Sequence, residues 1–448
     1  MPSTPAYWPQ VVGEQATRPV TITHGVQEYT ENYQTVGGAQ NAQIMNVDLA
    51  DPNVHFSMAE AGNKLVDPSD ETISSMANRT GAVAGVNADE FAINTTGQPM
   101  GMVVQDGVLE ASPVASWPSE VEVLNNGQFE FTTETFTGTA DDTTSGSSEA
   151  LAAVNRIDQT GLVLANSFLG AAPISSSVVA TATPGSNPLD LTINSVTSGV
   201  TSLPQLAAGQ EDLFAAAGSA AAGWLSSDVH AGDTITVTDS ISPYGIGSAP
   251  DDVATAVSGA TFLVQNGQMA VPVQGGGENN VDYPVVGIGV TKDGKHAIMA
   301  AFNGRESENV ATGLTRPQEA QWFMAHGVYN AIEFDSGGSA EMVGRLPGEQ
   351  QVSVLNTPAD GDERPVANGL FIYSTETSPG PAVKAVVNGG SPMTVLNGTT
   401  EQVSAYATDA EDNPASGPMS VLVLPPCLAD WNNGQLSVHR AGLGVLVA

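Results

Sequence analysis

Short apolar runs separated by Gly, Pro, Asn and Asp recur along most of the chain, and this pattern predicts strands. The clearest predicted strands cover residues 43–49, 102–107, 234–238 and 261–267. Two of these segments end in Asp106-Gly107 or Asn266-Gly267, the type of residue pair that most strongly predicts a β-hairpin. Residues 286–290 and 297–301 flank a further predicted turn at residues 292–295.

Helical periodicity is confined to a few segments. Residues 69–79 have helical spacing, with Ser69 or Asp70 as the expected N-cap. Residues 316–327 are expected to follow Thr315 as N-cap and to end at a glycine. A shorter third helix is expected within residues 207–225. The chain is therefore predicted to be α+β, with a strand-rich domain that contains few helices.

The 448-residue length exceeds one ordinary core, so we expect more than one domain. Residues 1–376 are predicted to form the main domain, with polar surface insertions near 139–148 and 275–280. Residues 374–381 are rich in Thr, Ser and Pro and indicate a linker. Residues 382–448 alternate apolar and polar positions between turns, which predicts a small all-β sandwich. This segment resembles bacterial immunoglobulin-like modules.

The formal charge of -36 arises because Lys and Arg together number only 12, against 48 Asp and Glu. Such a chain should be repelled by nucleic acid and by anionic membrane surfaces, so neither is an expected partner. The sequence lacks an apolar run of the ~18–20 residues that a membrane span requires. Any phosphate site must depend on a few arginines and on backbone N–H groups.

Metal and cofactor chemistry has little support in the sequence. Cys427 is the only cysteine, which excludes an intrachain disulfide and cysteine metal sites. The histidines show no zinc-hydrolase spacing, and neither a G-x-S-x-G nor a P-loop motif occurs. We therefore expect no metal and no cofactor. Residues 1–8 lack the basic and apolar regions of a secretory signal. We expect an extracellular, cell-surface or virion-associated protein. Either its secretory signal has been removed from the sequence, or the protein leaves its cell by another route, for example as part of a virus particle.

The segment Asp335-Ser336-Gly337-Gly338-Ser339 follows an apolar strand. The two glycines let a ligand approach the backbone and leave N–H groups to bind an anion or hydroxyls. Asp335 could act as a nucleophile, as a base or as a fixed negative charge beside a developing sugar cation. A tight strand-to-strand turn explains the same pattern.

A second polar cluster, Asn87 and Asp89, follows a predicted strand, and a loop that ends at Gly101 comes after it. Asn87 and Asp89 lie on the same side of an extended segment and could hold sugar hydroxyls or a catalytic water, whereas Glu90 would point the other way. Asx turns are the alternative explanation. Arg305 and Arg364 are candidate phosphate ligands because arginine is scarce in this chain, although surface ion pairs are the commoner fate of such residues.

Taken in order, these segments resemble the phosphodiester glycosidase family over roughly residues 21–374. The matching stretches are residues 74–91, 97–107, 256–267, 304–305, 313–315, 335–339 and 363–368. The resemblance implies a strand-rich fold with Asp335 and Asp89 as catalytic candidates. The implied substrate-binding residues are Asn87, Gly101, Arg305, Gly337, Gly338, Ser339, Arg364 and Asn368.

Two departures bear on activity. Family members usually have Arg-Thr where this chain has Val285-Val286, and Asp-Gly-Arg where Asn303-Gly304-Arg305 stands. Val285 therefore stands where the resemblance leads us to expect a positively charged arginine side chain.

Two hypotheses follow from this sequence. The first is a glycosidase that cleaves a sugar-1-phosphate diester in a cell-surface glycan. The second is a non-catalytic glycan-binding or structural component of a virion or cell surface. The expected partner is a carbohydrate or sugar-phosphate polymer, and a second copy or an assembly partner could dock through the C-terminal module.

Overall fold

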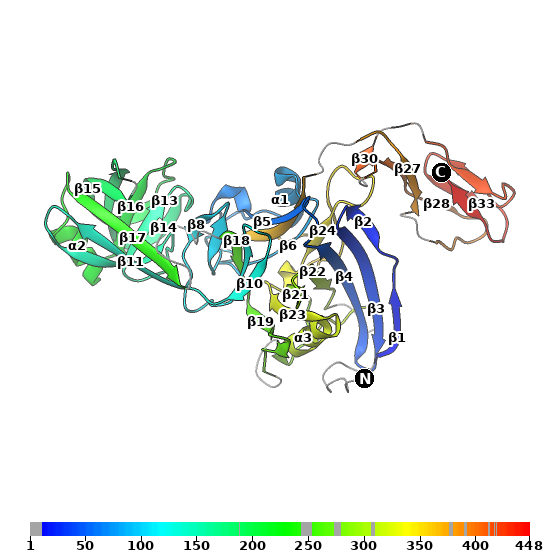
Figure 1. Ribbon diagram of the computed structural model, residues 1–448, viewed down its shortest axis with the longest axis horizontal. Helices are drawn as coiled ribbons and strands as arrows, with labels where there is room; N and C mark the ends of the chain where they lie inside the picture. Colours follow the sequence, from blue (N-terminus) through cyan, green and yellow to red (C-terminus); the bar gives the residue numbers. More distant parts are fainter. Residues whose placement is uncertain are drawn as a thin grey trace.

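The computed structural model describes residues 11–187, 189–242, 253–272, 279–305, 310–375, 380–388, 392–410, 413–415, 417 and 419–448. Figure 1 shows three parts along the long axis of the molecule: a β-barrel at one end, a central body, and a small β-module at the C-terminal end. The candidate site lies in the central body, which is built from three antiparallel sheets.

The first and largest sheet has the order β1-β3-β4-β22-β21-β23-β19-β20, with β2 paired to β3. Its strands are β1 (Val11–Ala16), β2 (Val20–Thr23), β3 (Val26–Thr35), β4 (Gly38–Asp48), β19 (Thr261–Gln265), β20 (Gln268–Met269), β21 (Val285–Thr291), β22 (His296–Phe302) and β23 (Val328–Glu333). Both hairpins predicted for this region are confirmed. Asn266 and Gly267 join β19 to β20 with φ angles of 53° and 73°, the left-handed pair that a tight hairpin turn requires.

The second sheet has the order β25-β24-β6-β26-β5, and the third has the order β10-β9-β18-β7-β8. The second contains β5 (Val54–Glu60), β6 (Ala84–Asn87), β24 (Met342–Gly344), β25 (Ser353–Val354) and β26 (Asn368–Ser374). The third contains β7 (Val103–Gln105), β8 (Val108–Ala111), β9 (Glu120–Leu124), β10 (Phe129–Thr132) and β18 (Val253–Ser258). The predicted turn at Asp106-Gly107 joins β7 to β8.

One apolar core joins the three sheets. Met299 of the first sheet, Leu370 of the second and Val257 of the third belong to the same buried cluster. The helix α3 (Arg316–Ala325) packs on the outer face of the first sheet, and α1 (Ile73–Thr80) packs on the outer face of the second. The sheets are thereby buried on both faces over the region that carries the candidate site.

The helix predictions are confirmed to different degrees. Thr315 caps α3 through a capping box in which the Thr315 N–H donates to Gln318 Oε1 at 2.8 Å, as the sequence indicated. The predicted start of α1 was wrong: Asp70 has a φ of 49°, and the N-cap is Thr72, whose Oγ1 accepts from the Ser75 N–H at 3.3 Å. The third helix, α2 (Ala220–Ser227), is shorter than its predicted segment because residues 211–216 form a strand.

Along the chain, a closed barrel is inserted between β10 and β18, which are both strands of the third sheet. Its strands are β11 (Thr135–Asp142), β12 (Ser148–Val154), β13 (Leu162–Asn166), β14 (Ala172–Pro184), β15 (Asp190–Leu203), β16 (Glu211–Ala216) and β17 (Thr234–Ser242). The insertion predicted near 139–148 is only the β11–β12 turn of this barrel. The sequence did not reveal the larger insertion because its strands have the same short alternating pattern as the rest of the chain. The second predicted insertion, near 275–280, lies mostly outside the described residues.

The C-terminal segment is all-β, in three small sheets around Val403, Ala429 and Leu436. Its strands are β27 (Lys384–Val387), β28 (Thr400–Gln402), β29 (Ala405–Thr408), β30 (Pro414–Ala415), β31 (Leu422–Leu424), β32 (Ala429–Asn432), β33 (Gln435–Val438) and β34 (Val445–Val447). The strand-rich α+β fold class is confirmed, while the immunoglobulin-like assignment and the linker stay predictions. None of the helices in the described part of the chain has the length and apolar character to cross a membrane.

Candidate functional site

The segment 335–339 is the crossover from the first sheet to the second. It leaves the end of β23, forms the short helix η3 (Gly337–Ser339), and leads into β24. Backbone hydrogen bonds fix both sides of Asp335: its N–H donates to the Ala88 carbonyl at 2.8 Å, and the Gly337 N–H donates to the Pro284 carbonyl at 2.8 Å. Gly337 has a φ of 72°, a conformation that favours glycine. The crossover is therefore held rigidly where the ends of both sheets meet.

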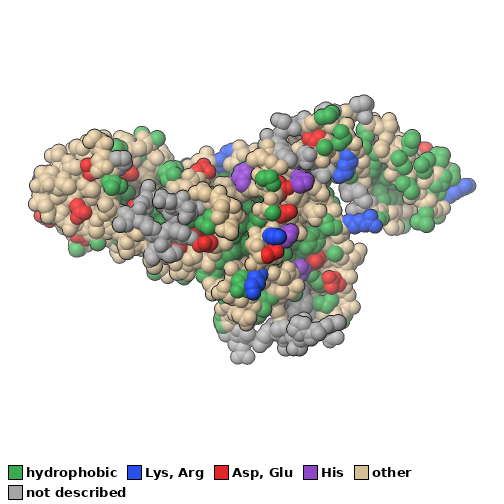
Figure 2. Space-filling model, in the orientation of Figure 1, with side chains coloured by type: hydrophobic (Ala, Val, Ile, Leu, Met, Phe, Trp, Pro, Cys, Tyr) green, Lys and Arg blue, Asp and Glu red, His purple; other side chains and the backbone are tan. Residues whose placement is uncertain are grey.

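An open cavity of about 380 Å³ adjoins this crossover. Its chemically active lining consists of Glu90, Tyr283, Arg305, Arg316, Glu333, Asp335 and Ser336. Glu333 and Asp335 come from the same chain segment two residues apart, so both carboxylates face the same cavity. The cavity thus combines acids with two arginines, in a chain where basic side chains are scarce (Figure 2).

Burial raises the pKa of Asp335 to about 6, and the charges of Glu333 and Asp89 act in the same direction. A hydrogen bond from Ser339 and the positive charge of Arg364 oppose that rise. An acid in a cavity whose pKa is raised by burial in this way is a candidate functional group.

Arg364 acts on Asp335 through Ser339. Its Nη1 donates to Ser339 Oγ at 3.2 Å, while Nε and Nη2 donate to one oxygen of Asp360 at 2.9 and 2.5 Å. Gly338 provides the room for this guanidinium, because a Cβ there would lie 1.9 Å from Arg364 Nη2. Arg364 is not among the residues that line the cavity, so in this structure it positions Ser339 and Asp335.

Glu333 was not predicted from the sequence. Its carboxylate accepts hydrogen bonds from the Tyr283 hydroxyl and from Arg316 Nε, both at 2.7 Å. Glu319 of α3 lies fully buried behind it, and burial together with the charge of Glu333 raises the pKa of Glu319 far above its ordinary value. Burial thus favours the neutral form of Glu319, and Arg316 forms its ion pair with Glu333. The available sequence signal was the position of Glu333, two residues before Asp335 on the same strand.

Arg305 is the cation that remains open to a ligand. Its side chain is exposed, and in the described part of the chain its guanidinium makes no hydrogen bond or ion pair. The backbone at Arg305 has a φ of 60°, an uncommon conformation for a residue with a side chain. Nη2 would lie 3.1 Å from a Cβ built on Gly337, so the guanidinium sits directly over the crossover.

The other predicted residues lie behind the crossover. Asp89 is buried, with the backbone N–H of Ser258 and the side chain of Asn368 bonded to its carboxylate at 3.2 and 2.8 Å. Asn87 donates to the Asp335 carbonyl at 2.5 Å and accepts from the Glu341 N–H at 3.0 Å. Asn87 therefore positions the crossover, while Asp89 is held by Ser258 and Asn368 behind it. Their contact with substrate or water stays a prediction.

Glu90 lines the cavity, whereas Gly101 packs behind it against Ser258 and Asp89. Glu90 points away from Asn87 and Asp89, as expected, and thereby lines the cavity. A Cβ on Gly101 would lie 1.9 Å from Ser258 Oγ and 3.0 Å from Asp89 Oδ1, so this glycine serves the packing behind Asp89.

Val285 takes no part in the cavity. It is fully buried in the cluster between the first sheet and α3, beside Tyr283 and Phe323. The cation that reaches the cavity from this side is Arg316, at the first turn of α3. Among the described residues, there is no group of three or more His, Cys, Asp and Glu side chains suited to holding a metal ion.

Residues 192–373 match the model of the phosphodiester glycosidase family. The resemblance predicted from the sequence is therefore confirmed over this part of the chain. The matched part contains Arg305, Asp335, Arg364 and Asn368. No curated protein is significantly similar to the chain.

Solved structures share the fold at low sequence identity. A hypothetical protein from Synechocystis aligns with a TM-score of 0.65 and 16% identity over 80% of this chain, which spans only 63% of the length of that protein. A candidate exported protein from Burkholderia pseudomallei K96243 aligns with a TM-score of 0.64 and 17% identity, over 83% of this chain and 99% of that one. The catalytic domain of zebrafish N-acetylglucosamine-1-phosphodiester alpha-N-acetylglucosaminidase is a weaker match, with a TM-score of 0.41 and 14% identity over 81% of this chain and 89% of that domain.

Proposed function

We propose that this protein is a glycosidase that cleaves a sugar-1-phosphate diester in a cell-surface glycan, with the Asp335 cavity as its active site. The observation that carries the proposal is one cavity that contains a carboxyl group with a pKa of about 6 and two arginines. A sugar-1-phosphate diester presents a carbon that becomes positive and a phosphate that leaves as an anion. The cavity holds groups of opposite charge for both.

In this proposal Asp335 is ionised and either attacks or stabilises the anomeric carbon. Arg305 and Arg316 hold the phosphate, and Glu333 fixes the position of Arg316. Phosphate is a good leaving group, so strong general-acid help is unnecessary. The protein would act outside the cell or at a surface, which agrees with the exported character suggested for the Burkholderia relative.

The test is release of sugar from a panel of sugar-1-phosphate diesters by the wild type and by Asp335→Asn. We expect the variant to lose at least about 100-fold in kcat/KM, the scale of loss when an essential charged group is removed. In the wild type kcat/KM should rise through pH 6, because ionised Asp335 is the active form. Wild-type turnover by Asp335→Asn would refute the role of Asp335.

A second candidate is glycan binding without turnover, as part of a virion or a cell surface. It is favoured by Val285, which stands in the buried core where family members usually have arginine. Under this hypothesis the wild type binds sugar-phosphate ligands in the same cavity and releases no sugar at high protein concentration. Clear hydrolysis at low enzyme concentration excludes it.

A further inference from the structure

A second concave site lies at the other end of the second sheet. Its volume is about 420 Å³, within the ~300–1,000 Å³ range of small-molecule sites. Its walls come from β5, β26 and the edge of the third sheet. Tyr373 is five residues along β26 from Asn368, which backs the Asp335 cavity, so about 17 Å separates the two sites along this strand.

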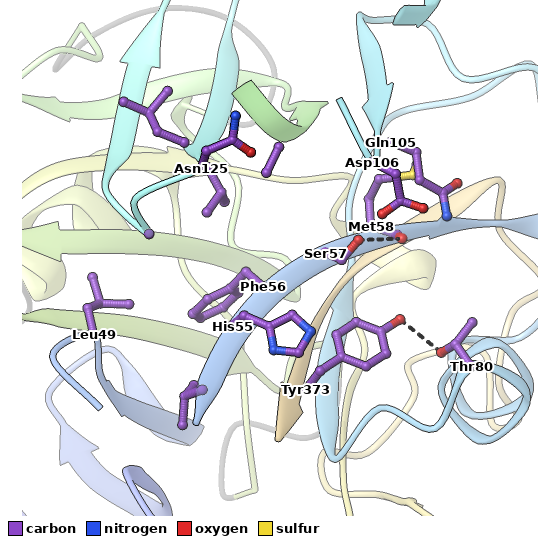
Figure 3. Close-up of a pocket in the computed structure, with 15 residues that line it drawn as sticks. Leu49, His55, Phe56, Ser57, Met58, Thr80, Gln105, Asp106, Asn125 and Tyr373 are labelled. Carbon is purple, nitrogen blue, oxygen red and sulfur yellow. Dashed lines mark hydrogen bonds between the residues drawn. The ribbon is translucent and has the colours of Figure 1, made fainter. Parts of the chain in front are cut away.

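Two aromatic rings form one wall of this groove. His55 of β5 and Tyr373 of β26 are directly opposed across the strand pair, and their rings stack with centroids 5.3 Å apart and an interplanar angle of 18°. The Tyr373 hydroxyl donates to Thr80 Oγ1 at 2.9 Å, which fixes the ring (Figure 3). In this stacked pair each ring covers one face of the other, Tyr373 supports His55, and the His55 ring is the exposed one.

Hydrogen-bonding groups face these rings across the groove. Gln105 and Asp106, at the β7–β8 turn, line one side, and Asn125 lines the other (Figure 3). In the part of the chain that the structure describes, the Gln105 amide and the Asp106 carboxylate make no side-chain hydrogen bond. Leu49, Val54 and Leu124 add aliphatic surface.

The charges in the groove select against an anionic ligand. Among the described residues that line it, Asp106 is the only acid and there is no lysine or arginine. Burial lowers the pKa of His55, which disfavours a positive charge on this ring. A phosphate group would meet a negative carboxylate and no cation here, in contrast to the Asp335 cavity.

We propose that the groove of His55, Tyr373, Gln105, Asp106 and Asn125 is a second carbohydrate site that binds an uncharged sugar unit of a glycan chain. A sugar ring has an apolar C–H face, which fits the exposed aromatic ring that Tyr373 supports, and a rim of hydroxyls, which fits amide and carboxylate groups. The choice of sugar over another neutral ligand rests on the proposed function. The site would hold a polymer to the protein while the Asp335 cavity acts on one of its linkages.

The test uses an array of neutral oligosaccharides and sugar-1-phosphate-linked oligosaccharides, with the full chain as probe. We expect binding of neutral members, and the tightest of these is then titrated by NMR. Tyr373→Leu and His55→Leu should each weaken its binding by about tenfold, since they keep apolar bulk and lose the flat ring. Tyr373→Phe keeps the ring and should bind within about twofold of the wild type. Asp106→Asn removes the charge and should also retain binding; a strong loss would indicate a cationic ligand and overturn the proposal.

Asp335→Asn separates this site from the proposed function. If the wild type hydrolyses sugar-phosphate diesters but the ring variants bind every array member as the wild type does, the second site is refuted alone. If Asp335→Asn and the wild type bind neutral glycans through His55 and Tyr373 and neither hydrolyses a diester, the second site stands and the enzymatic proposal fails. Absence of any neutral glycan binding by the wild type also overturns the inference. Thermal unfolding of each variant checks that the fold is retained.

Discussion

Gly338→Ala is the most informative single change at the Asp335 site, because it acts on Arg364 without altering any charged residue. A Cβ at Gly338 would lie 1.9 Å from Arg364 Nη2 and 2.6 Å from Asp360 Oδ2. Both are ends of flexible side chains, and Gly338 does not have a positive φ, so the backbone can accept alanine. The guanidinium must therefore move, and its hydrogen bond to Ser339 breaks.

The size of the effect on Asp335 follows from the distances. Two successive hydrogen bonds, Arg364 to Ser339 and Ser339 to Asp335, separate the charges by about 6 Å. The Arg364 side chain is 28% exposed, so an effective dielectric constant of about 40 applies, and Coulomb's law gives about 1.4 kcal/mol. Complete loss of this interaction would raise the pKa of Asp335 from about 6 to about 7, since one pKa unit corresponds to ~1.4 kcal/mol. We expect the displaced guanidinium of Gly338→Ala to raise the pKa of Asp335 toward that value.

The assay is an NMR titration of ¹³C-labelled aspartate carboxyl groups, which needs no substrate. Arg364→Gln should raise the pKa of Asp335 at least as far, because it removes the charge that Gly338→Ala only displaces. Gly223→Ala is the matched control: this glycine lies within α2, its added Cβ meets no atom within 4 Å, and the pKa of Asp335 should stay at about 6. If Gly338→Ala also leaves the pKa of Asp335 unchanged, Arg364 does not control this group and the argument is wrong.

Three further predictions concern stability and the cavity. Gly101→Ala should lower the free energy of unfolding by about 2–4 kcal/mol, because its Cβ would lie 1.9 and 2.0 Å from Ser258 Oγ and Cβ inside the core. Urea titrations measure this change, and a loss below about 0.5 kcal/mol would contradict the prediction. Arg316→Gln should raise KM for a sugar-1-phosphate diester by about tenfold or more, and an unchanged KM would remove Arg316 from phosphate binding. Burial raises the pKa values of Glu120 and Glu341 to about 9, so the stability linked to these groups is full below about pH 4 and is lost as pH rises toward 9. The Tm should accordingly fall between pH 5 and pH 9, and a Tm that rises over this range would disprove the assignment of these two acids.

The sequence predicted features that local chemistry determines. The Asn-Gly and Asp-Gly turns and the N-cap at Thr315 formed as expected, since each depends on a few adjacent residues. The crossover at Asp335 was recognised as a strand end followed by glycines. The role of Gly338 could not be predicted, because it depends on Arg364, which approaches from a distant segment.

The remaining features depend on contacts between distant parts of the chain. Glu333 and Arg316 belong to the cavity because α3 packs beside β23, and no spacing in the sequence shows that. Asp89 has the sequence appearance of an exposed site residue, but the fold surrounds it with Ser258 and Asn368. The barrel was missed because closure of a sheet depends on which strands pair, and an alternating pattern is the same in an open sheet and a closed one.

The barrel also links the stability of distant parts of the chain. Its first and last strands pair with each other, with Thr135 opposite Ser242, so the two ends of the insertion emerge side by side. β18 can then pair with β9 almost as in a hairpin, although the barrel separates them in sequence. If the barrel were unfolded, roughly a hundred residues would form a flexible loop, and closing it would cost about 4 kcal/mol of chain entropy. A core mutation that unfolds only the barrel should therefore weaken the central body by at least a similar amount, because it also removes hydrogen bonds such as those from Arg156 to the Pro99 and Ser112 carbonyls.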